Sequence, residues 1–397
     1  MRICLLIFLL LPSVLLAQSV SYPDSLKHII QNSSNGVKKA DAYQLLIAEM
    51  QSQDPQSAKT LIGALHHLSG KIGYPQGIVN AYYQYGIYYN LQGKFDSLKH
   101  YAEKCLQISA QYQIALAQAQ GNQLLGTYFW QTGKYDESTK YHLKALKIRE
   151  GHQDEAGIGS SLLSLGTVSF SNNKPDMAQK YAQKALLIGH KIKDDKLILK
   201  SLHLLANVSG SGGDYKQALK YDAEALKICA KTNNRRGFSE VYSNMATCYF
   251  YMGQYDASLL YHYKVLEIDQ FFRDDKQIGD TYFNLAGVYH QKKDHKKAIA
   301  LLNEAILLFK NTQYQYGLRN AYQLLSEIYN DTHDFKDALA AHRQYVSIAN
   351  QISNEKNEKH IAELNIQYET EKKEKELEAL NQRFTIQKLQ LAQRNTF

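Results

Sequence analysis

The apolar and small residues of this chain recur at a fixed spacing of 40 residues. A small residue sets the phase of each copy, and aliphatic residues follow 20 and 22 positions later. The small residues are Gly86, Gly126, Gly166, Ala206, Ala246, Ala286 and Ser326. A degenerate earlier copy has Leu46, Pro55 and Leu68 in phase. A period of this length predicts one supersecondary unit stacked on copies of itself, because a single unit cannot bury its own apolar face.

Each copy is expected to be a helical hairpin. In one copy apolar residues from Leu124 to Phe129 follow helical spacing, a break occurs at Gly133, and helical spacing resumes from Tyr135 to Arg149. Four glycines and an asparagine share the position where the first helix must end in a left-handed residue. They are Gly93, Gly133, Asn173, Gly213 and Gly253. A second shared position, where two helices must approach closely, holds small residues in seven copies: Ala58, Ser138, Ala178, Ala218, Ser258, Ala298 and Ala338.

The sequence therefore predicts an all-α fold, an α-α superhelix followed by one long C-terminal helix. No proline follows Pro175, which favours nearly continuous helix over the second half of the chain. We expect a signal peptide in residues 1–17, a lead-in segment over 18–37, eight repeats over 38–353 and a long charged helix over 354–397. The repeats correspond to sixteen antiparallel helices in eight hairpins.

The segments at 124–148 and 245–268 resemble tetratricopeptide repeats. Both contain, in order, the family's small residue followed by an aromatic one, its Gly-x-Tyr turn, its second small residue and its aliphatic pair. The resemblance covers residues 38–353, with a period six residues longer than the usual 34. It is similar to the longer-helix variant found in many bacterial signalling proteins. The resemblance implies a tetratricopeptide-type solenoid whose first helices line a concave groove.

The first seventeen residues have the features of a secretory signal peptide. Arg2 precedes an apolar run from Ile3 to Leu11, and Ala17 supplies a small residue for cleavage. The apolar run is too short to span a bilayer as a mature helix. The alternative is a buried N-terminal helix, but no polar face supports it. We therefore expect an exported, periplasmic protein.

Composition and motifs argue against catalysis and against nucleic-acid binding. The remaining cysteines, Cys105, Cys229 and Cys248, are odd in number and occupy core positions of the repeat, which predicts small buried residues rather than disulfides. The net charge of +8 is modest, and the densest basic cluster, at 292–297, falls in one interhelix turn. No common catalytic, phosphate-binding or helical two-histidine metal motif occurs, so we expect no enzyme, no cofactor and no metal.

By the tetratricopeptide resemblance, two positions of each first helix point into the concave groove. They hold many aromatic residues, which supply rigid contact area for a peptide or protein ligand. The candidate groove residues are Tyr83, Trp130, Phe170, His203, Phe250, Phe283 and His290. The alternative is that the long helices bury these rings between repeats. The lysine and asparagine set with which some family members hold a C-terminal carboxylate is not reproduced, since Lys200 and Asn207 stand alone.

The last 44 residues depart from the repeat. Charges of both signs alternate at helical spacing, as in Glu369 with Lys372, and one apolar seam begins at Ile361 and another at Leu377. Sixteen residues separate these two, which is not a whole number of heptads, so the pattern does not establish a uniform coiled coil. Two alternatives remain: a single charged helix, and a helix that pairs in a homodimer or with a partner.

The segment from Ala362 to Glu376 resembles the linker helix of bacterial signal-transduction proteins that are common in the Bacteroidetes. In these proteins a signal peptide and extracytoplasmic tetratricopeptide repeats lead to such a helix, then to a membrane span and a histidine kinase or helix-turn-helix output. The resemblance implies a sensory region that would meet the membrane only through a span downstream of Phe397. The alternative function is a free-standing periplasmic adaptor that assembles protein partners without signalling.

Overall fold

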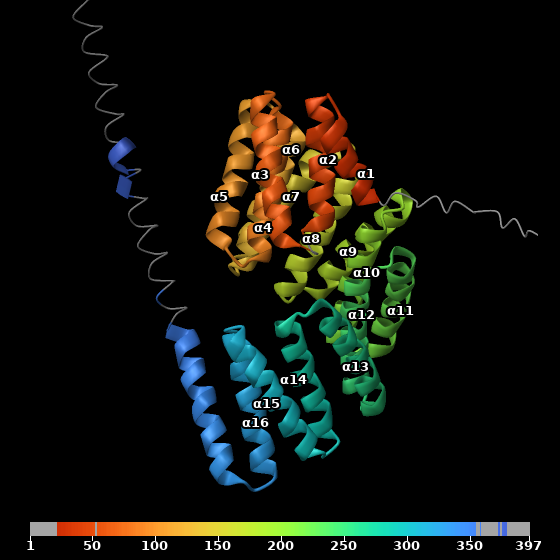
Figure 1. Ribbon diagram of the computed structural model, residues 1–397, viewed down its shortest axis with the longest axis vertical. Helices are drawn as coiled ribbons and strands as arrows, with labels where there is room; N and C mark the ends of the chain where they lie inside the picture. The colour runs from red at the N-terminus through yellow and green to blue at the C-terminus, as the bar shows by residue number, and fades with distance from the viewer. Residues whose placement is uncertain (1–21, 52–53, 355–357, 359–371, 374, 379–397) are drawn as a thin grey trace, which may run out of the picture. The chain divides into compact units, whose positions relative to one another are not determined.

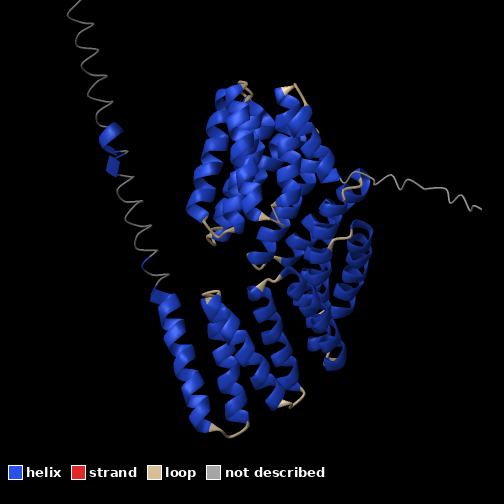
Figure 2. Ribbon diagram, viewed as in Figure 1, coloured by secondary structure: helices blue, strands red, loops and turns tan. Residues whose placement is uncertain are grey.

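The computed structural model describes residues 22–51, 54–354, 358, 372–373 and 375–378. These residues form helices joined by short turns, with no strand in any of the described ranges (Figure 2). The predicted signal peptide and most of the predicted long helix over 354–397 lie outside the described residues. The chain divides into two compact units, Met1–Gly212 and Gly213–Phe397.

The first unit contains ten labelled helices (Figure 1). They are α1 (Tyr22–Asn32), α2 (Gly36–Met50), α3 (Pro55–Lys71), α4 (Pro75–Leu91), α5 (Phe95–Gln111), α6 (Ala115–Gln131), α7 (Tyr135–Gly151), α8 (Glu155–Ser171), α9 (Pro175–Ile192) and α10 (Asp195–Ser211). The described part of the second unit continues with α11 (Tyr215–Thr232), α12 (Arg235–Tyr251), α13 (Tyr255–Phe272), α14 (Asp275–Gln291), α15 (His295–Asn311) and α16 (Gln315–Asp331), and with a further helix over 335–354.

A helix begins every 20 residues from Pro55 to Phe335, so that each 40-residue period contains two helices. The prediction of an all-α solenoid built from tandem helical hairpins is confirmed. The lead-in segment differs from the prediction because it contains α1, which the repeat pattern did not indicate. Leu26 of α1 is only 3% exposed and packs with Ala42 and Leu46 of α2, so α1 covers the apolar face at the start of the array.

The turns repeat as regularly as the helices. A residue with positive φ ends the turn every 20 residues from Gly73 to His333, and the predicted glycines and Asn173 are among these residues. At Gly133, for example, the amide of Lys134 donates to the carbonyl of Phe129 at 2.8 Å, and Gly133 donates to Trp130 at 3.0 Å. This pair of bonds is the Schellman motif, which satisfies the last carbonyls of a helix. Between hairpins the same conformation is held mainly by residues other than glycine, such as Gln113 and Arg273.

The two helices of a hairpin cross at the predicted small residues. The hydroxyl of Ser138 donates to the carbonyl of Gly126 at 2.7 Å, and Ser326 donates to the carbonyl of Ala338 at 3.0 Å. The two residues of each pair are twelve positions apart. Each bond therefore joins the small residue that sets the phase, on the first helix, to the small residue at the second shared position, on the second helix. All seven small residues at the second position are buried. The remaining copy has the larger Leu98 at this position, and it is fully buried as well.

Stacked aromatic pairs also join the two helices of a hairpin, three residues after the crossing positions. Three copies place two rings nearly parallel, with centroids 5.3 to 5.5 Å apart, again between residues twelve positions apart. The pairs are Tyr89 with Tyr101, Phe129 with Tyr141, and Tyr249 with Tyr261. Much of the high tyrosine content therefore serves hairpin packing.

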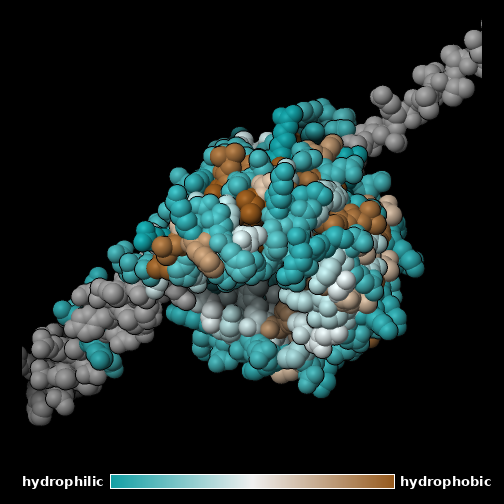
Figure 3. Space-filling view, turned by 90° about the horizontal axis from the view of Figure 1, so that it is seen from below, coloured by the Kyte–Doolittle hydropathy of each residue, from teal (hydrophilic) through white to brown (hydrophobic). Residues whose placement is uncertain are grey.

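The surface contrasts with this apolar interior. On the face shown in Figure 3 hydrophilic side chains predominate, and the apolar ones form small separate patches. Exposed apolar side chains such as Leu187 and Leu260 are scattered over different helices. Single apolar residues on a surface are ordinary in folded proteins, so they do not by themselves mark a binding site.

Two glycines of the hairpin formed by α6 and α7 should change its stability in opposite directions when each is replaced by alanine. Gly133 lies in the turn of the hairpin and Gly151 at its end. Gly133 has φ +75°, where a Cβ atom is strained, so Gly133→Ala should lower the free energy of unfolding by about 1 kcal/mol. Gly151 is the last residue of α7, and a Cβ atom there would meet nothing within 4 Å, so Gly151→Ala should raise it by roughly 0.5 kcal/mol. Urea unfolding curves of both variants measure the difference, and equal shifts of the same sign would contradict it.

Candidate functional site

All seven candidate groove residues lie on first helices of the hairpins. In the first unit Tyr83 lies on α4, Trp130 on α6, Phe170 on α8 and His203 on α10. In the second unit Phe250 lies on α12, and Phe283 and His290 lie on α14. Each of the seven is half-buried, so none belongs to the fully buried core and none projects freely. Their role in ligand binding stays a prediction.

The contacts of these residues differ from one to the next. Tyr83 and Phe283 pack against the core clusters of their units, and burial raises the pKa of the Tyr83 hydroxyl. Trp130 donates its indole N–H to the hydroxyl of Ser171 at 2.8 Å, and Phe250 lies beside Tyr255 with ring centroids 5.8 Å apart. Several of these rings are therefore packed against neighbouring residues on one side and partly exposed to solvent on the other.

In the first unit, polar side chains link α2 to α4, α4 to α6 and α6 to α8. Gln51, the residue after α2, donates to the side chain of Gln84 of α4 at 3.0 Å, and Gln131 of α6 donates to Asn90 of α4 at 3.1 Å. The series includes further bonds of Asn80 to Gln44, Gln123 to Ser160 and Trp130 to Ser171. These amides and hydroxyls can both donate and accept hydrogen bonds, so the row of first helices presents the same chemistry as a peptide backbone.

The row of first helices in this unit curves back on itself. Neighbours α2, α4, α6, α8 and α10 contact one another in turn. At the ends of the row, Lys196 of α10 forms an ion pair with Glu49 of α2, with Nζ and Oε1 2.8 Å apart across 147 residues of sequence. The surface formed by these five helices is therefore strongly curved.

A buried arginine joins this network from a second helix. Arg149, near the end of α7, donates to the side chains of Gln123 at 2.6 Å and Ser161 at 2.7 Å, and to the carbonyl of Gly157 at 3.1 Å. The nearest carboxylate is that of Asp154, 3.9 Å from Nε. Burial lowers the pKa of the guanidinium, while Tyr83 and Asp154 oppose that change. The guanidinium thus orders the polar side chains of α6 and α8 beneath Tyr83.

The first helices of the second unit carry charges instead of amide pairs. Lys276 and Asp280 of α14 form an ion pair at 3.1 Å. His290 lies 3.9 Å from the carboxylate of Asp331 and 3.4 Å from His295, and burial lowers its pKa. The two units therefore offer different surfaces at equivalent positions of the repeat.

The aromatic positions of the repeat and the known motifs did not predict these polar pairs. A signal was nevertheless present. One position of the first helix is polar in all seven marked copies: Asn80, Gln120, Ser160, Lys200, Glu240, Asp280 and Asn320. Polar residues at one position of an otherwise apolar repeat indicate a face that the packing of the repeat does not cover.

Comparison with known proteins supports the repeat assignment. Models described as tetratricopeptide repeat match residues 237–311 and 279–351, and others match residues 124–152 and 198–236. The chain contains tetratricopeptide repeats. No curated protein sequence is a significant match to this chain.

Solved structures of similar fold have low sequence identity to the tetratricopeptide chain, so they show the fold alone. A signal transduction ATPase with numerous domains and a tetratricopeptide repeat sensor, from Pyrococcus horikoshii, has a TM-score of 0.59 and 16% identity. The match covers 85% of this chain and 55% of that one. A Rap protein complexed with competence and sporulation factor has a TM-score of 0.54 and 14% identity over 80% of this chain and 99% of that one.

A third structure of this fold is the apo form of the quorum sensor NprR from B. thuringiensis. Its TM-score is 0.51 and its identity is 14%, over 78% of this chain and 97% of that one. The tetratricopeptide solenoid of the present chain is thus shared with proteins described as sensors, at identities that carry no residue-level correspondence.

Other chemistry is sparse along the described part of the repeats. There, no three His, Cys, Asp or Glu side chains gather as a metal site would require. Within the same ranges, no helix combines the length and the apolar character that a membrane span needs. Cys105, Cys229 and Cys248 are free and buried, as predicted, and burial raises the pKa of Cys229 and of Cys248 to about 11.

One position of the second helix holds buried titratable groups in three repeats. It is occupied by His142, Asp222 and His262, each at most 3% exposed, whereas the other copies have Ile62, Ala102, Ala182, Leu302 and the exposed His342. Burial lowers the pKa of each histidine to about 4. Burial raises the pKa of Asp222 to about 7, against a smaller opposing effect of Asn244. The folded repeats therefore favour the neutral form of all three groups.

The pKa of Asp222 predicts how stability depends on pH. The folded carboxyl keeps its proton up to about pH 7, whereas the unfolded one loses it near 3.8, so Asp222 lowers stability as pH rises from about 4 to 7. Asp222→Asn should therefore leave stability nearly unchanged at pH 4 and raise it by on the order of 3 kcal/mol at pH 8.

Urea unfolding at the two pH values measures this effect. Glu224→Gln, an exposed change on the same helix α11, is the control and should be nearly neutral at both. An Asp222→Asn effect of equal size at pH 4 and pH 8 would show that the carboxyl ionises in the folded protein as it does in water.

Proposed function

We propose that this chain is an exported tetratricopeptide scaffold that binds a protein or peptide, and that it is the sensory part of a membrane-linked signal-transduction protein. Ligand binding would use the curved face of the first helices, including Tyr83, Trp130 and Phe170. In this proposal the C-terminal helix passes the bound state onward, as a homodimer or with a partner, and contact with the membrane comes through a downstream span. No catalytic step, cofactor or nucleic acid takes part.

The observation that carries the proposal is the curved row of first helices in the first unit. Amide and hydroxyl side chains line the row at intervals of one repeat, and half-buried aromatic rings lie among them. An extended peptide needs hydrogen-bond partners for its backbone and apolar contact for its side chains. Both are offered here by neighbouring positions on the same helices.

The sensory part of the proposal is supported by the leader-like first seventeen residues and by the tail sequence from Ala362 to Glu376. Two structures of the same fold are described as sensors, and a third is described as a complex with a factor. A solenoid suits this role because adjacent repeats share packed interfaces, so a ligand that spans several repeats acts on the curvature of all of them.

Selection from a random peptide library tests peptide binding before any natural ligand is identified. Random dodecapeptides displayed on phage are selected on the purified full chain, and selected peptides are synthesised and titrated against variants. Trp130→Ala should weaken their binding at least about tenfold, because an aromatic contact residue contributes a few kcal/mol. Tyr112→Ala, which removes an exposed ring from the turn after α5, should have no effect.

Thermal melting of the Trp130→Ala protein separates binding from packing. The proposal requires a melting temperature close to that of the parent chain. A large decrease would instead assign the indole to packing between repeats, as large-to-small core substitutions do. Peptides that bind the Trp130→Ala and parent proteins equally well would exclude this part of the face from the binding site.

Export has a separate test. Residues 1–40 are fused to alkaline phosphatase without its own leader, an enzyme that becomes active only after export. We expect activity from this fusion in a bacterial host. Leu9→Arg, which places a charge in the apolar run, should abolish it while the fusion protein is still synthesised. An inactive parent fusion, or equal activity in both fusions, would contradict export by this segment.

A further inference from the structure

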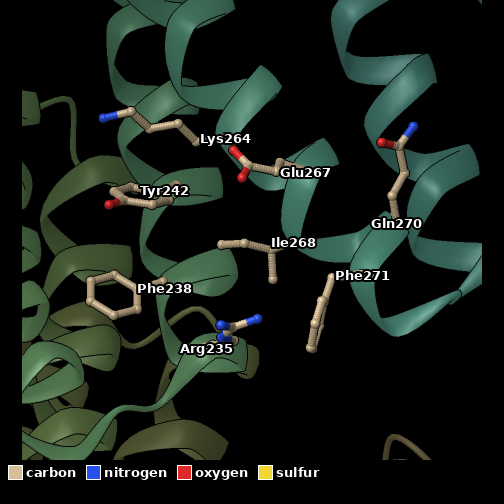
Figure 4. A pocket seen from close by; sticks show the side chains of 8 residues that line it. All are labelled: Arg235, Phe238, Tyr242, Lys264, Glu267, Ile268, Gln270 and Phe271. Carbon is tan, nitrogen blue, oxygen red and sulfur yellow. The ribbon is translucent and has the colours of Figure 1, made fainter.

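The second unit contains a cavity of about 750 Å³ between the start of α12 and the end of α13 (Figure 4). Eight side chains line it: Arg235, Phe238, Tyr242, Lys264, Glu267, Ile268, Gln270 and Phe271. The cavity is separate from the candidate groove. Phe238 lies twelve residues before Phe250, which turns it about 120° around the helix, and five of the eight lining residues come from the second helix α13.

Two residues of this cavity depart from the repeat in a way that packing does not require. The position of Arg235 holds aspartate in both neighbouring repeats, Asp195 and Asp275. The position of Phe271 holds Lys231 and Asn311 there. Phe271 is 62% exposed, so its ring contributes little to the core. An exposed phenylalanine beside an arginine, at positions that are polar or acidic in both neighbouring repeats, is a local change that packing of the core does not explain.

The cations of the cavity have aromatic neighbours and no acidic partner. The guanidinium of Arg235 lies 4.3 Å from the centroid of the Phe271 ring, and Figure 4 shows it between the rings of Phe238 and Phe271. The ammonium of Lys264 lies 5.1 Å from the Tyr242 ring centroid and 5.0 Å from that of Tyr261.

Among the residues that the structure describes, no carboxylate forms an ion pair with Arg235 or Lys264. Glu267 is the one acid in the lining, and it is exposed. The lining therefore carries a net charge of +1 from two cations and one anion, with aromatic rings between them. A guanidinium stacked on a ring keeps its N–H groups in the plane free to bind a carboxylate in a bidentate manner.

We propose that this cavity binds an amphipathic carboxylate, a small acid with an apolar body. The body packs on Phe238, Tyr242 and Ile268, and Arg235 binds the carboxylate. Lys264 raises the positive potential on the opposite side of the cavity. The site is independent of peptide binding by the first helices, so either activity can exist without the other.

The probes are 4-phenylbutanoate and its neutral amide, 4-phenylbutanamide, titrated into the full chain by calorimetry and by saturation-transfer NMR. The acid should bind at least about tenfold more tightly than the amide, the ratio expected for one charge-assisted bidentate contact. Arg235→Gln should remove most of this preference, and Lys264→Gln should reduce it several-fold. Both side chains are outside the core, so melting temperatures should stay unchanged.

The control is Lys144→Gln, because Lys144 holds the position of Lys264 three repeats earlier in the sequence. Lys144 also lies over a tyrosine, 4.7 Å from the Tyr141 ring centroid, but Ala115, Gln118 and Asn122 stand at the positions of Arg235, Phe238 and Tyr242. This variant should bind the acid like the parent chain. Equal binding of acid and amide, binding of neither, or unchanged binding by the Arg235→Gln protein would overturn the proposal.

A second series distinguishes a free acid from a chain terminus as the source of the carboxylate. Acetyl-Ala-Ala-Phe is titrated as the free acid and as the amide. Tighter binding of the peptide acid than of 4-phenylbutanoate, lost in the Arg235→Gln protein, assigns the site to a C-terminal carboxylate. Tighter binding of 4-phenylbutanoate assigns it to a free acid.

Discussion

The close crossing of two helices at a pair of small residues is the constraint on which most of the hairpins depend. Where Gly126 meets Ser138, a helix carbonyl accepts a hydrogen bond from the opposite helix at 2.7 Å, which is attainable only when the two backbones nearly touch. The tight crossing aligns the apolar faces on either side, so that neighbouring hairpins can pack against them. Both units therefore use the same two positions, while the exposed positions are free to vary.

This division explains how much could be predicted from sequence. The crossing residues, the turn glycines and the apolar stripe repeat in phase, so helix boundaries followed from the 40-residue period alone. Even Pro175 and His295, which stand where the five other marked copies have Phe or Tyr, begin regular helices, because their positions require only helical backbone. The helix α1 was missed because its apolar residues are not in phase with any repeat.

The site was less predictable because it depends on side chains that vary between repeats. The partner of Gln123 is Ser160, 37 residues away, and whether two such amides and hydroxyls meet depends on the rotation of each helix. Arg149 reaches its partners from the second helix of a hairpin, whereas all predicted groove positions lie on first helices. The cavity near Arg235 requires the start of one helix to lie beside the end of the next. The 40-residue period predicts where each position lies in the fold. The polar and charged groups that form the candidate sites, however, are side chains that differ from one repeat to the next.

The ion pair between Lys196 and Glu49 has a mechanical consequence. Exposed ion pairs contribute at most about 1 kcal/mol, and salt at physiological concentration weakens them further. The ends of the row of first helices are thus joined by a weak link, whereas each pair of adjacent helices is joined by a packed core. Breaking this one ion pair, by a small force or by a change in ionic strength, therefore changes the curvature of the row of first helices without unfolding any hairpin.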